Sequence, residues 1–474
     1  MHRSVPALAV ALTMLASCAS YRPEPISAAT SAKALEARTL DNPRLQRFIA
    51  AALSLDGNRR GTSSWDLARL TLAAVYYHPE LDIARAKLAS AEAGVVTARQ
   101  IPNPSLDFGL TYNSTTTVPS PWTVGPLVNF VLETFGKRGY RTAQARALAD
   151  ASREDLASAT WLVRGRVRTA LLGLWAAKGR LALERRRLGL QDELVGLLEQ
   201  RFAAGEASSL DVTRERIRRN RISLAMHDVE RHEAEARAQL AAAIGIPARA
   251  LHGVPLSLEA FDKPPALGPE VATGELRRQA LLHRSDVQSL LAQYAAAQAA
   301  LQLEVANQYP NLTLGIGYTY DQGDNKYTLS PGAELPVFNQ NQGPIAQAEA
   351  RRAEAAARFT ALQASIIGAI DTAGADYRGA QRSLATARSL AAQEKRRADQ
   401  LLRSLRAGGV DRPTLLGAQL QLAAARLSRF DAAVVQRQAV GRLEDAAHSA
   451  LFDPGAPLPA PENNPRLASE PPHE

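Results

Sequence analysis

Histidine and cysteine are the residue types that most directly suggest metal or catalytic chemistry, and this chain has eight histidines and one cysteine. His227 and His232 lie five residues apart, about 140° around a helix, so they do not share a ligand face. His78 and His283 have no paired ligand close to them in the sequence. The sequence also lacks the motifs of a serine nucleophile, a phosphate-binding loop and a dinucleotide fold. We therefore expect no catalysis, no cofactor and no tight metal site.

Composition and charge narrow the class of protein further. The 474 residues are 46% apolar and 5% aromatic, and the net charge is +9. The charges are interspersed, and no basic arm carries interleaved aromatic residues, which argues against nucleic-acid binding. A single cysteine excludes a disulfide framework. Beyond the N-terminus no run of 18 apolar residues predicts a transmembrane helix, and abundant Ala, Leu and Arg favour long helices.

The single cysteine lies at the end of a predicted export signal. A short basic start precedes an apolar run over residues 5–15. The run closes with Leu15-Ala16-Ser17-Cys18, which resembles the bacterial lipoprotein signal. The next residue is Ala19, not the Asp that in this class of signal favours retention in the inner membrane. This resemblance implies that residues 1–17 are removed, that Cys18 is lipidated, and that the protein is anchored in the outer membrane. A lone buried cysteine is the alternative.

The chain contains a direct repeat. Residues 104–112 (PSLDFGLTY) match residues 310–318 (PNLTLGIGY), and Ala204-Gly205 matches Ala407-Gly408. We expect a first copy over 63–244, an equatorial linker rich in Gly and Pro over 245–274, and a second copy over 275–450. The flanking parts, residues 18–62 and a Pro-rich tail over 451–474, are expected to be extended or disordered peripheral segments.

Each copy holds two predicted strands with apolar residues at every second position. The strands cover about 104–112 and 122–134 in the first copy, and about 310–320 and 327–337 in the second. One apolar face and one small or polar face suit a transmembrane β-barrel, although a soluble pair of hairpins would share the pattern. Tyr and Trp favour a membrane interface, and we predict a belt of such residues at Tyr112, Trp122, Tyr318, Tyr320 and Tyr327.

Four strands cannot close a barrel by themselves. Open edges in lipid would leave backbone N–H and C=O groups unpaired, and the smallest closed barrels need about eight strands. The strands must therefore be shared between chains, and three chains would give twelve.

Long helices are expected to frame the strands. Residues 137–203 contain no proline, and apolar residues recur every seven positions in a coiled-coil pattern. The second copy repeats this helix over about 345–406. Shorter return helices follow over about 209–244 and 414–450. Each return helix is about half as long as the helix before it. Helices over about 64–100 and 275–308 are expected to cover the other half of that length, so that each return path consists of two stacked half-helices.

Together these features resemble the TolC-type outer-membrane factors, the exit ducts of tripartite efflux pumps. The resemblance covers roughly 60–450 and rests on the duplication, the strand starts at Pro104 and Pro310, the segment Phe135-Gly136-Lys137-Arg138-Gly139, and the glycine turns. Within the family, residues 132–138 are most similar to the cobalt–zinc–cadmium efflux branch. The resemblance implies a mainly α homotrimer, in which a twelve-stranded barrel with four strands per chain continues into a long α-helical barrel in the periplasm. It also implies a periplasmic adaptor and an inner-membrane pump as partners. The resemblance to the cobalt–zinc–cadmium branch implies passive export of heavy-metal cations for a pump of the resistance–nodulation–division class.

The resemblance places candidate functional residues at the tunnel tip. Asp211, six residues after Gly205, lies where the family often has an acidic residue that faces the pore. Threefold symmetry would make a ring of three carboxylates, which attracts cations. Alternatively, Asp211 only stabilises the N-terminus of its helix.

The second copy departs from this pattern. The position six residues after Gly408 is Thr414, so Glu206 or Asp411 would have to supply a second acidic ring. Arg412 could pair with an acidic neighbour to hold the tip shut. The turns at Gly205, Gly408 and Gly409 are the candidate adaptor-docking sites.

Two other functions fit the sequence less closely. A drug or protein export duct would have the same architecture. A structural periplasmic coiled-coil lipoprotein without a channel would have no need for aromatic-rich alternating hairpins.

Overall fold

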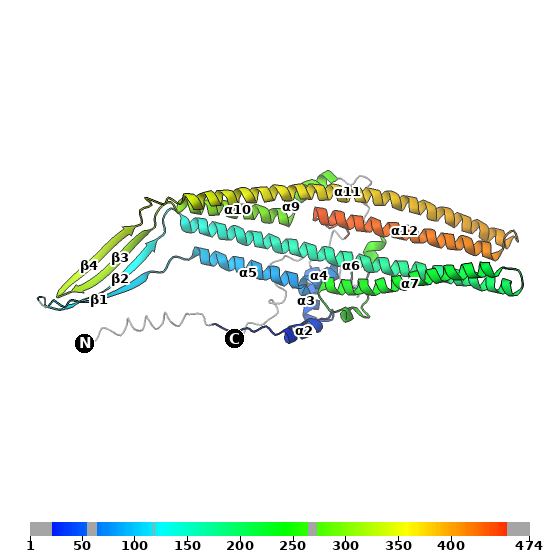
Figure 1. Ribbon diagram of the computed structural model, residues 1–474, viewed down its shortest axis with the longest axis horizontal. Helices are drawn as coiled ribbons and strands as arrows, with labels where there is room; N and C mark the ends of the chain where they lie inside the picture. Colours follow the sequence, from blue (N-terminus) through cyan, green and yellow to red (C-terminus); the bar gives the residue numbers. More distant parts are fainter. Residues whose placement is uncertain (1–20, 55–63, 116, 118, 264–272, 453–474) are drawn as a thin grey trace.

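The computed structural model describes residues 21–54, 64–115, 117, 119–263 and 273–452. The predicted signal over 1–17, Cys18 and nearly all of the Pro-rich tail lie outside the described residues. The molecule is long and narrow, with a four-stranded sheet at one end and two helical hairpin turns at the other (Figure 1). Among the helices of the described residues, none is both long and apolar enough to cross a membrane.

Two helices run the full length of the helical body, α6 (Lys137–Ala203) and α11 (Gln342–Arg406). α7 (Ser209–Ile244) and α12 (Arg412–Ala447) return from the hairpin turns over about half of that length. α5 (Pro79–Arg99) and α10 (Ser285–Ala306) cover the half next to the sheet (Figure 1). α6 packs between α5 and α7 on one side and α10 and α12 on the other. The predicted internal repeat and its long helical frame are confirmed.

The helices that lead into the strands are each broken, although the sequence predicts continuous helices over 64–100 and 275–308. The first is divided into α4 (Leu67–Tyr77) and α5, with His78 extended between them. Pro79 explains this break, because the residue before a proline is driven out of the helical region. The second is divided at Arg284 into α9 (Thr273–His283) and α10. No proline marks this break. Arg284 instead pairs with Asp286 at 2.7 Å and donates to the carbonyl oxygen of Ala446.

The four strands form one antiparallel sheet in the order β1-β2-β3-β4. They are β1 (Ser105–Tyr112), β2 (Trp122–Leu132), β3 (Leu312–Asp321) and β4 (Asp324–Ala333). The register brings apolar residues together on one face across all four strands, as in the row Leu106, Val128, Ile316 and Leu329. The other face is mostly small and polar, and on it Asn129 donates to Asp107 at 2.6 Å. The sheet is therefore apolar on one face only.

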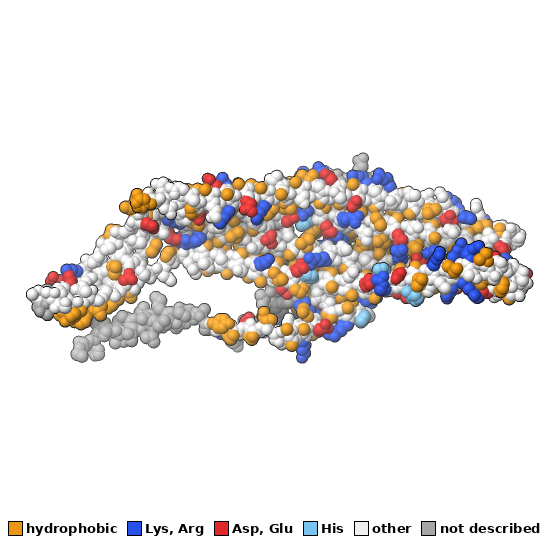
Figure 2. All heavy atoms as spheres, viewed as in Figure 1, with side chains coloured by type: hydrophobic (Ala, Val, Ile, Leu, Met, Phe, Trp, Pro, Cys, Tyr) orange, Lys and Arg blue, Asp and Glu red, His pale blue; other side chains and the backbone are white. Residues whose placement is uncertain are grey.

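The apolar face of the sheet is uncovered in a single chain. On β1 the side chains of Leu106, Phe108, Leu110 and Tyr112 are between 57 and 67% exposed, and Figure 2 shows hydrophobic side chains along the sheet. The outer edges of β1 and β4 have no paired strand within the described residues. The described part of a single chain therefore exposes both an apolar sheet face and two strand edges with free backbone groups.

Two strand details depend on backbone geometry. β4 begins three residues before the predicted start at 327, because Gln322 and Gly323 both adopt positive φ and close a tight hairpin directly before Asp324. It also ends at Ala333 rather than 337, because its partner β3 begins at Leu312. Gly125 in β2 allows the close approach of β3, since a Cβ there would lie 2.0 Å from the carbonyl oxygen of Tyr318.

Residues 18–62 contain helices, which corrects the prediction of an extended segment. α2 (Ala28–Glu36) and α3 (Pro43–Ser54) are helical, and Leu45, Ile49 and Leu53 form a buried stripe along α3. α3, α4, the 3-10 turn η1 (Ala248–Leu251) and α8 (Glu259–Asp262) bury side chains in one layer against the middle of the helical body. α2 is attached to this layer by an ion pair between Glu36 and Arg249 at 2.8 Å, and we call the whole layer the belt (Figure 1). The predicted equatorial linker contributes η1 and α8 to this belt.

A buried charge cluster joins α6 to the end of α12 at the height of the belt. Glu444 is fully buried and receives hydrogen bonds from Arg164 and Arg168, the second at 3.1 Å. Its other oxygen accepts from the backbone N–H groups of Leu451 and Phe452 at 2.9 and 3.0 Å. Burial acts to raise the pKa of Glu444, but the two guanidiniums outweigh it and lower that pKa overall. The cluster fixes the C-terminal end of α12 against α6.

Candidate functional site

The two hairpin turns at the end opposite the sheet bring the predicted tip residues together (Figure 1). Gly205 ends α6 and Gly408 ends α11, and both have φ of +77°. This left-handed conformation is easy for glycine and costly for other residues. After Gly205, the N–H of Glu206 bonds to the carbonyl oxygen of Arg201 at 2.8 Å. After Gly408, the N–H of Gly409 bonds to that of Ser404 at 2.9 Å. The two turns therefore close in the same way.

The first turn is stabilised within itself. Ser208 caps α7, and its hydroxyl accepts from the backbone N–H of Asp211 at 3.1 Å and donates to the Asp211 carboxylate at 2.6 Å. Asp211 also lies 3.4 Å from Arg214 in the next turn of the same helix. Its side chain is 48% exposed. Asp211 thus stabilises its helix while it still presents a carboxylate to solvent.

The second turn is tied to the first copy of the repeat. Asp411 caps α12 by accepting from the N–H of Thr414 at 3.1 Å, and it also pairs with Arg201 of α6 at 2.9 Å. Hydrogen bonds from Thr414 lower the pKa of Asp411, and Arg201 acts in the same direction. Arg412 donates from Nε to the carboxylate of Glu193 on α6 at 3.0 Å. The structure therefore gives Arg412 an acidic partner, which is 219 residues away in the sequence.

Other ion pairs along the same stretch of α6 face α7. Arg216 donates to Glu199 at 2.8 Å, and Arg219 donates to Asp192 at 2.7 Å. α6 thus offers carboxylates to arginines of both neighbouring return helices. Sequence analysis missed Asp192, Glu193 and Glu199, because only their position opposite these arginines distinguishes them from other surface carboxylates.

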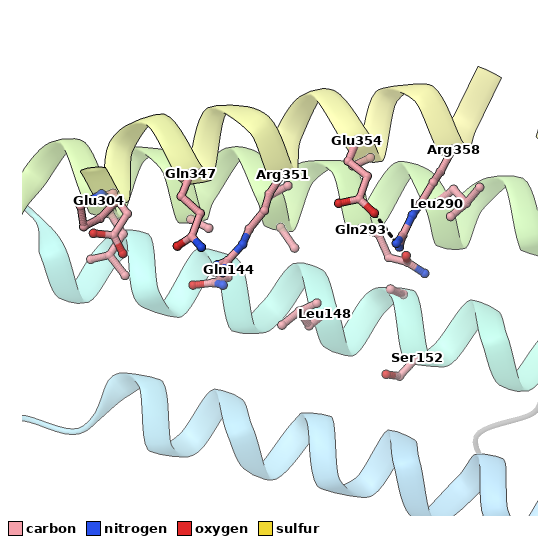
Figure 3. Close-up of a pocket in the computed structure, with 18 of the residues that line it drawn as sticks. Gln144, Leu148, Ser152, Leu290, Gln293, Glu304, Gln347, Arg351, Glu354 and Arg358 are labelled. Carbon is pink, nitrogen blue, oxygen red and sulfur yellow. Dashed lines mark hydrogen bonds and ion pairs between the residues drawn. The ribbon is translucent and has the colours of Figure 1, made fainter. Parts of the chain in front are cut away.

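One face of α6 lines a row of three grooves. Leu148, Asp155, Leu162, Thr169 and Ala176 recur every seven residues, and each lies in a groove wall. We call the grooves upper, middle and lower in their order along α6 from the sheet toward the hairpin turns. The upper groove has a volume of about 510 Å³ and lies between α6, α10 and α11 (Figure 3). The middle groove has about 590 Å³ and the lower about 470 Å³. The belt packs on other α6 residues, including Val167, Leu171 and Leu174, which lie on the opposite side of the helix.

The charges of these grooves differ. In the lower groove the carboxylates of Glu184, Asp228, Glu235 and Asp431 outnumber Arg180 and the imidazole of His232. Burial raises the pKa of Asp431, and Arg180 opposes this effect. In the upper groove Arg351 and Arg358 face three carboxylates, those of Asp155, Glu304 and Glu354 (Figure 3). The lower groove therefore has the larger excess of carboxylates over arginines.

The histidines that the structure describes do not gather into a site. His227 and His232 each lie near a glutamate of their own helix, Glu230 at 3.2 Å and Glu235 at 3.1 Å. His78 caps α5, and burial lowers its pKa. Within the described ranges, no three His, Cys, Asp or Glu side chains are arranged to hold a metal ion.

The predicted aromatic residues lie mainly toward the hairpin end of the sheet. Tyr112 and Trp122 contact each other with ring centroids 4.9 Å apart, and Tyr318 and Tyr327 are 5.5 Å apart. Tyr320 lies on the same apolar face, opposite Asn325. At the other end of the strands, Phe135 stacks on Tyr309 at 4.0 Å. Sequence analysis did not include this second group, although Tyr309 directly precedes the repeated Pro310.

A comparison with known families decides what this architecture is. The sequence profile described as "Outer membrane efflux protein" matches residues 73–246 and 276–447, which are the two copies of the repeat. The chain belongs to the outer membrane efflux protein family. The resemblance drawn from the sequence is therefore confirmed, as is the fold class.

Individual relatives of this efflux protein carry names that refer to different cargoes. The chain is 28% identical over 269 residues to the cobalt-zinc-cadmium resistance protein CzcC of Cupriavidus metallidurans, a match that covers 56% of this chain and 61% of that protein. It is 28% identical over 345 residues to the pyoverdine export outer membrane protein OpmQ of Pseudomonas aeruginosa, covering 68% of this chain and 70% of OpmQ. The solved outer membrane protein VceC of Vibrio cholerae superposes with a TM-score of 0.65 at 18% identity, over 80% of this chain and 95% of VceC. The chain thus spans about three fifths of CzcC.

Proposed function

We propose that three copies of this chain form a continuous duct through the outer membrane and the periplasm. The observation that carries the proposal is the sheet, with an uncovered apolar face, a polar face and two open edges on one end of a long helical wall. Pairing β4 of one chain with β1 of the next would satisfy both edges and leave the apolar face to lipid. A scaffold without a channel would need no such sheet.

Planar-bilayer recording of the purified protein tests this proposal. We expect a heat-labile trimer that conducts ions in discrete steps. A monomeric, water-soluble product without conductance would contradict the duct. Lipidation of Cys18 is a separate part of the proposal, and mass spectrometry of membrane-extracted protein against a Cys18→Ser variant checks it.

The cargo we propose is heavy-metal cations, delivered by an inner-membrane pump through a periplasmic adaptor. Two observations support this, namely the match to CzcC and the excess of carboxylates in the lower groove. A ring of three Asp211 side chains would add to this negative potential, with Glu206 and Asp411 nearby. The adaptor would dock at the turns of Gly205, Gly408 and Gly409.

An organic cargo is the second candidate, because OpmQ is named for pyoverdine export. Growth of a deletion strain on cobalt, zinc and cadmium salts, beside dyes, detergents and antibiotics, separates the two. Metal sensitivity that a plasmid copy restores would support the cation cargo. Sensitivity to organic compounds alone would overturn that cargo while the duct stands.

The tip contacts suggest how the duct is held closed. Arg412–Glu193 and Arg201–Asp411 both join the second hairpin turn to α6. We propose that opening moves the second hairpin and separates these two pairs, whereas the pairs between α6 and α7 persist.

A further inference from the structure

A basic hollow lies on the belt, apart from the duct wall. It has about 590 Å³ and is lined by residues of α2, α3 and α4 and their connections, including Arg38, Asn42, Arg44, Arg47, Tyr76 and Tyr77. No carboxylate is among the described residues that line it. Three guanidiniums in one concave site make a strong positive potential.

Arg38 is held in a fixed position at the inner side of this hollow. Its Nη1 donates to the carbonyl oxygens of Tyr77 at 2.7 Å and Gly245 at 2.8 Å. Its guanidinium also lies over the Tyr77 ring, 5.4 Å from the centroid. The hydroxyl of Tyr77 in turn donates to the carbonyl oxygen of Thr39 at 2.9 Å. A charge that is positioned in this way loses little entropy when an anion binds.

Arg44 and Arg47 lie one turn apart at the start of α3, and both are exposed. Asn42 before the helix accepts from the backbone N–H of Arg44 at 2.9 Å. No hydrogen bond or ion pair of either guanidinium is found within the described part of the chain. The helix dipole at the start of this twelve-residue helix adds further positive potential. Both guanidiniums are therefore available to a bidentate carboxylate.

We propose that this hollow binds the free carboxylates of an acidic peptide, namely the peptides that cross-link the bacterial cell wall. The proposal rests on the proposed duct, because it requires the helical body to cross the periplasm. In the proposed duct the grooved face of α6 lines the bore, so the belt, which packs on the opposite side of α6, faces outward at mid-height toward the wall. The duct would in this way be attached to the wall at its middle as well as to the membrane at its end.

Co-sedimentation of the purified full-length protein with isolated cell-wall sacculi tests this site. The variant is Arg44→Glu with Arg47→Glu, which leaves Arg38 and its contacts intact. The matched control is Arg22→Glu with Lys33→Glu, which makes the same charge change on exposed residues outside the hollow. We expect the wild type and the control to sediment alike, and the variant to bind roughly tenfold more weakly or worse.

Chemical arms of the same experiment identify the ligand. Sacculi whose carboxyl groups are converted to amides should no longer retain the wild type. Equal binding of the variant and the wild type, or unchanged binding to amidated sacculi, would overturn the proposal. Binding to phosphatidylglycerol vesicles that depends on Arg44 and Arg47, without binding to sacculi, would overturn it in favour of a phosphate ligand. Bilayer conductance reports on the duct separately, so a protein that conducts but does not sediment overturns this inference alone.

Discussion

The two hairpin turns are copies of one sequence unit, yet they are anchored differently. The turn between α6 and α7 is stabilised by contacts inside its own helix, from Ser208 to Asp211 and from Asp211 to Arg214. The turn between α11 and α12 is attached to the other copy, through Arg201–Asp411 and Arg412–Glu193. Duplication thus produced two equivalent turns, and divergence gave the second one the ion pairs to the other copy.

Among the variants that test this comparison, replacing the glycine of the second turn should have the largest effect on adaptor binding and transport. Gly408→Pro cannot adopt φ near +77°, and we expect a local cost of about 3 kcal/mol or more, loss of adaptor co-purification and loss of complemented growth. Trimers should persist, because the sheet lies at the other end. Gly205→Pro is the matched variant in the first turn. A Gly408→Pro protein that still binds adaptor and transports would refute docking at this turn.

Breaking both links between the two copies should have the next largest effect. Each exposed pair contributes about 0.2–1 kcal/mol, so Arg201→Gln with Glu193→Gln should raise the open probability several-fold in a trimer. Planar-bilayer recording measures this change. Arg216→Gln, which removes a pair between α6 and α7, is the control and should leave gating unchanged. Equal opening by the control would show that the links between copies have no special role.

Neutralising the exposed carboxylate of the first turn should have a smaller effect. Asp211→Asn keeps the shape of the side chain and removes one charge per chain, so cation preference should fall without a change in open probability. Reversal potentials in asymmetric KCl measure the preference. Unchanged selectivity would leave Asp211 with its helix-stabilising role only.

The smallest expected effect is the response of the second turn to acid. The pKa of Asp411 is lowered in the folded protein, so its stabilisation is complete above its ordinary pKa and is lost as the pH falls through the folded value. Closure should therefore persist from pH 7 to 5 and weaken below about pH 4. Thr414→Ala removes the first cause of the lowered pKa and should shift this weakening to higher pH. Identical titrations of both proteins would refute the contribution of Thr414.

The repeat made most of the fold predictable, because each element could be recognised twice. The break at His78 could have been read from Pro79, whereas the break at Arg284 depends on contacts with Asp286 and Ala446 that no local pattern shows. The helices within 18–62 were missed because the apolar pattern of α3 is short, with only Leu45, Ile49 and Leu53 in its stripe. These side chains are buried in one cluster with residues of α4 and α6, which a local pattern does not reveal.

The tip was predictable in its turns but not in its pairs. Gly205 and Gly408 follow from the rule that helices end at a left-handed glycine. The partner of Arg412 does not, because Glu193 lies in the other copy and becomes its neighbour only when α6 and α12 pack together. Long-range ion pairs of this kind are properties of the assembled helices.

The uncovered sheet also constrains how the molecule is made. A single chain in water would expose a continuous apolar surface and two strand edges whose backbone N–H and C=O groups have no paired strand in the described part of the chain. Such features promote misassembly and aggregation. The helical half has its own buried core and can mature first. In the proposed trimer the strands can be covered only when other chains and the bilayer are both present, so insertion and oligomerisation would occur as one step.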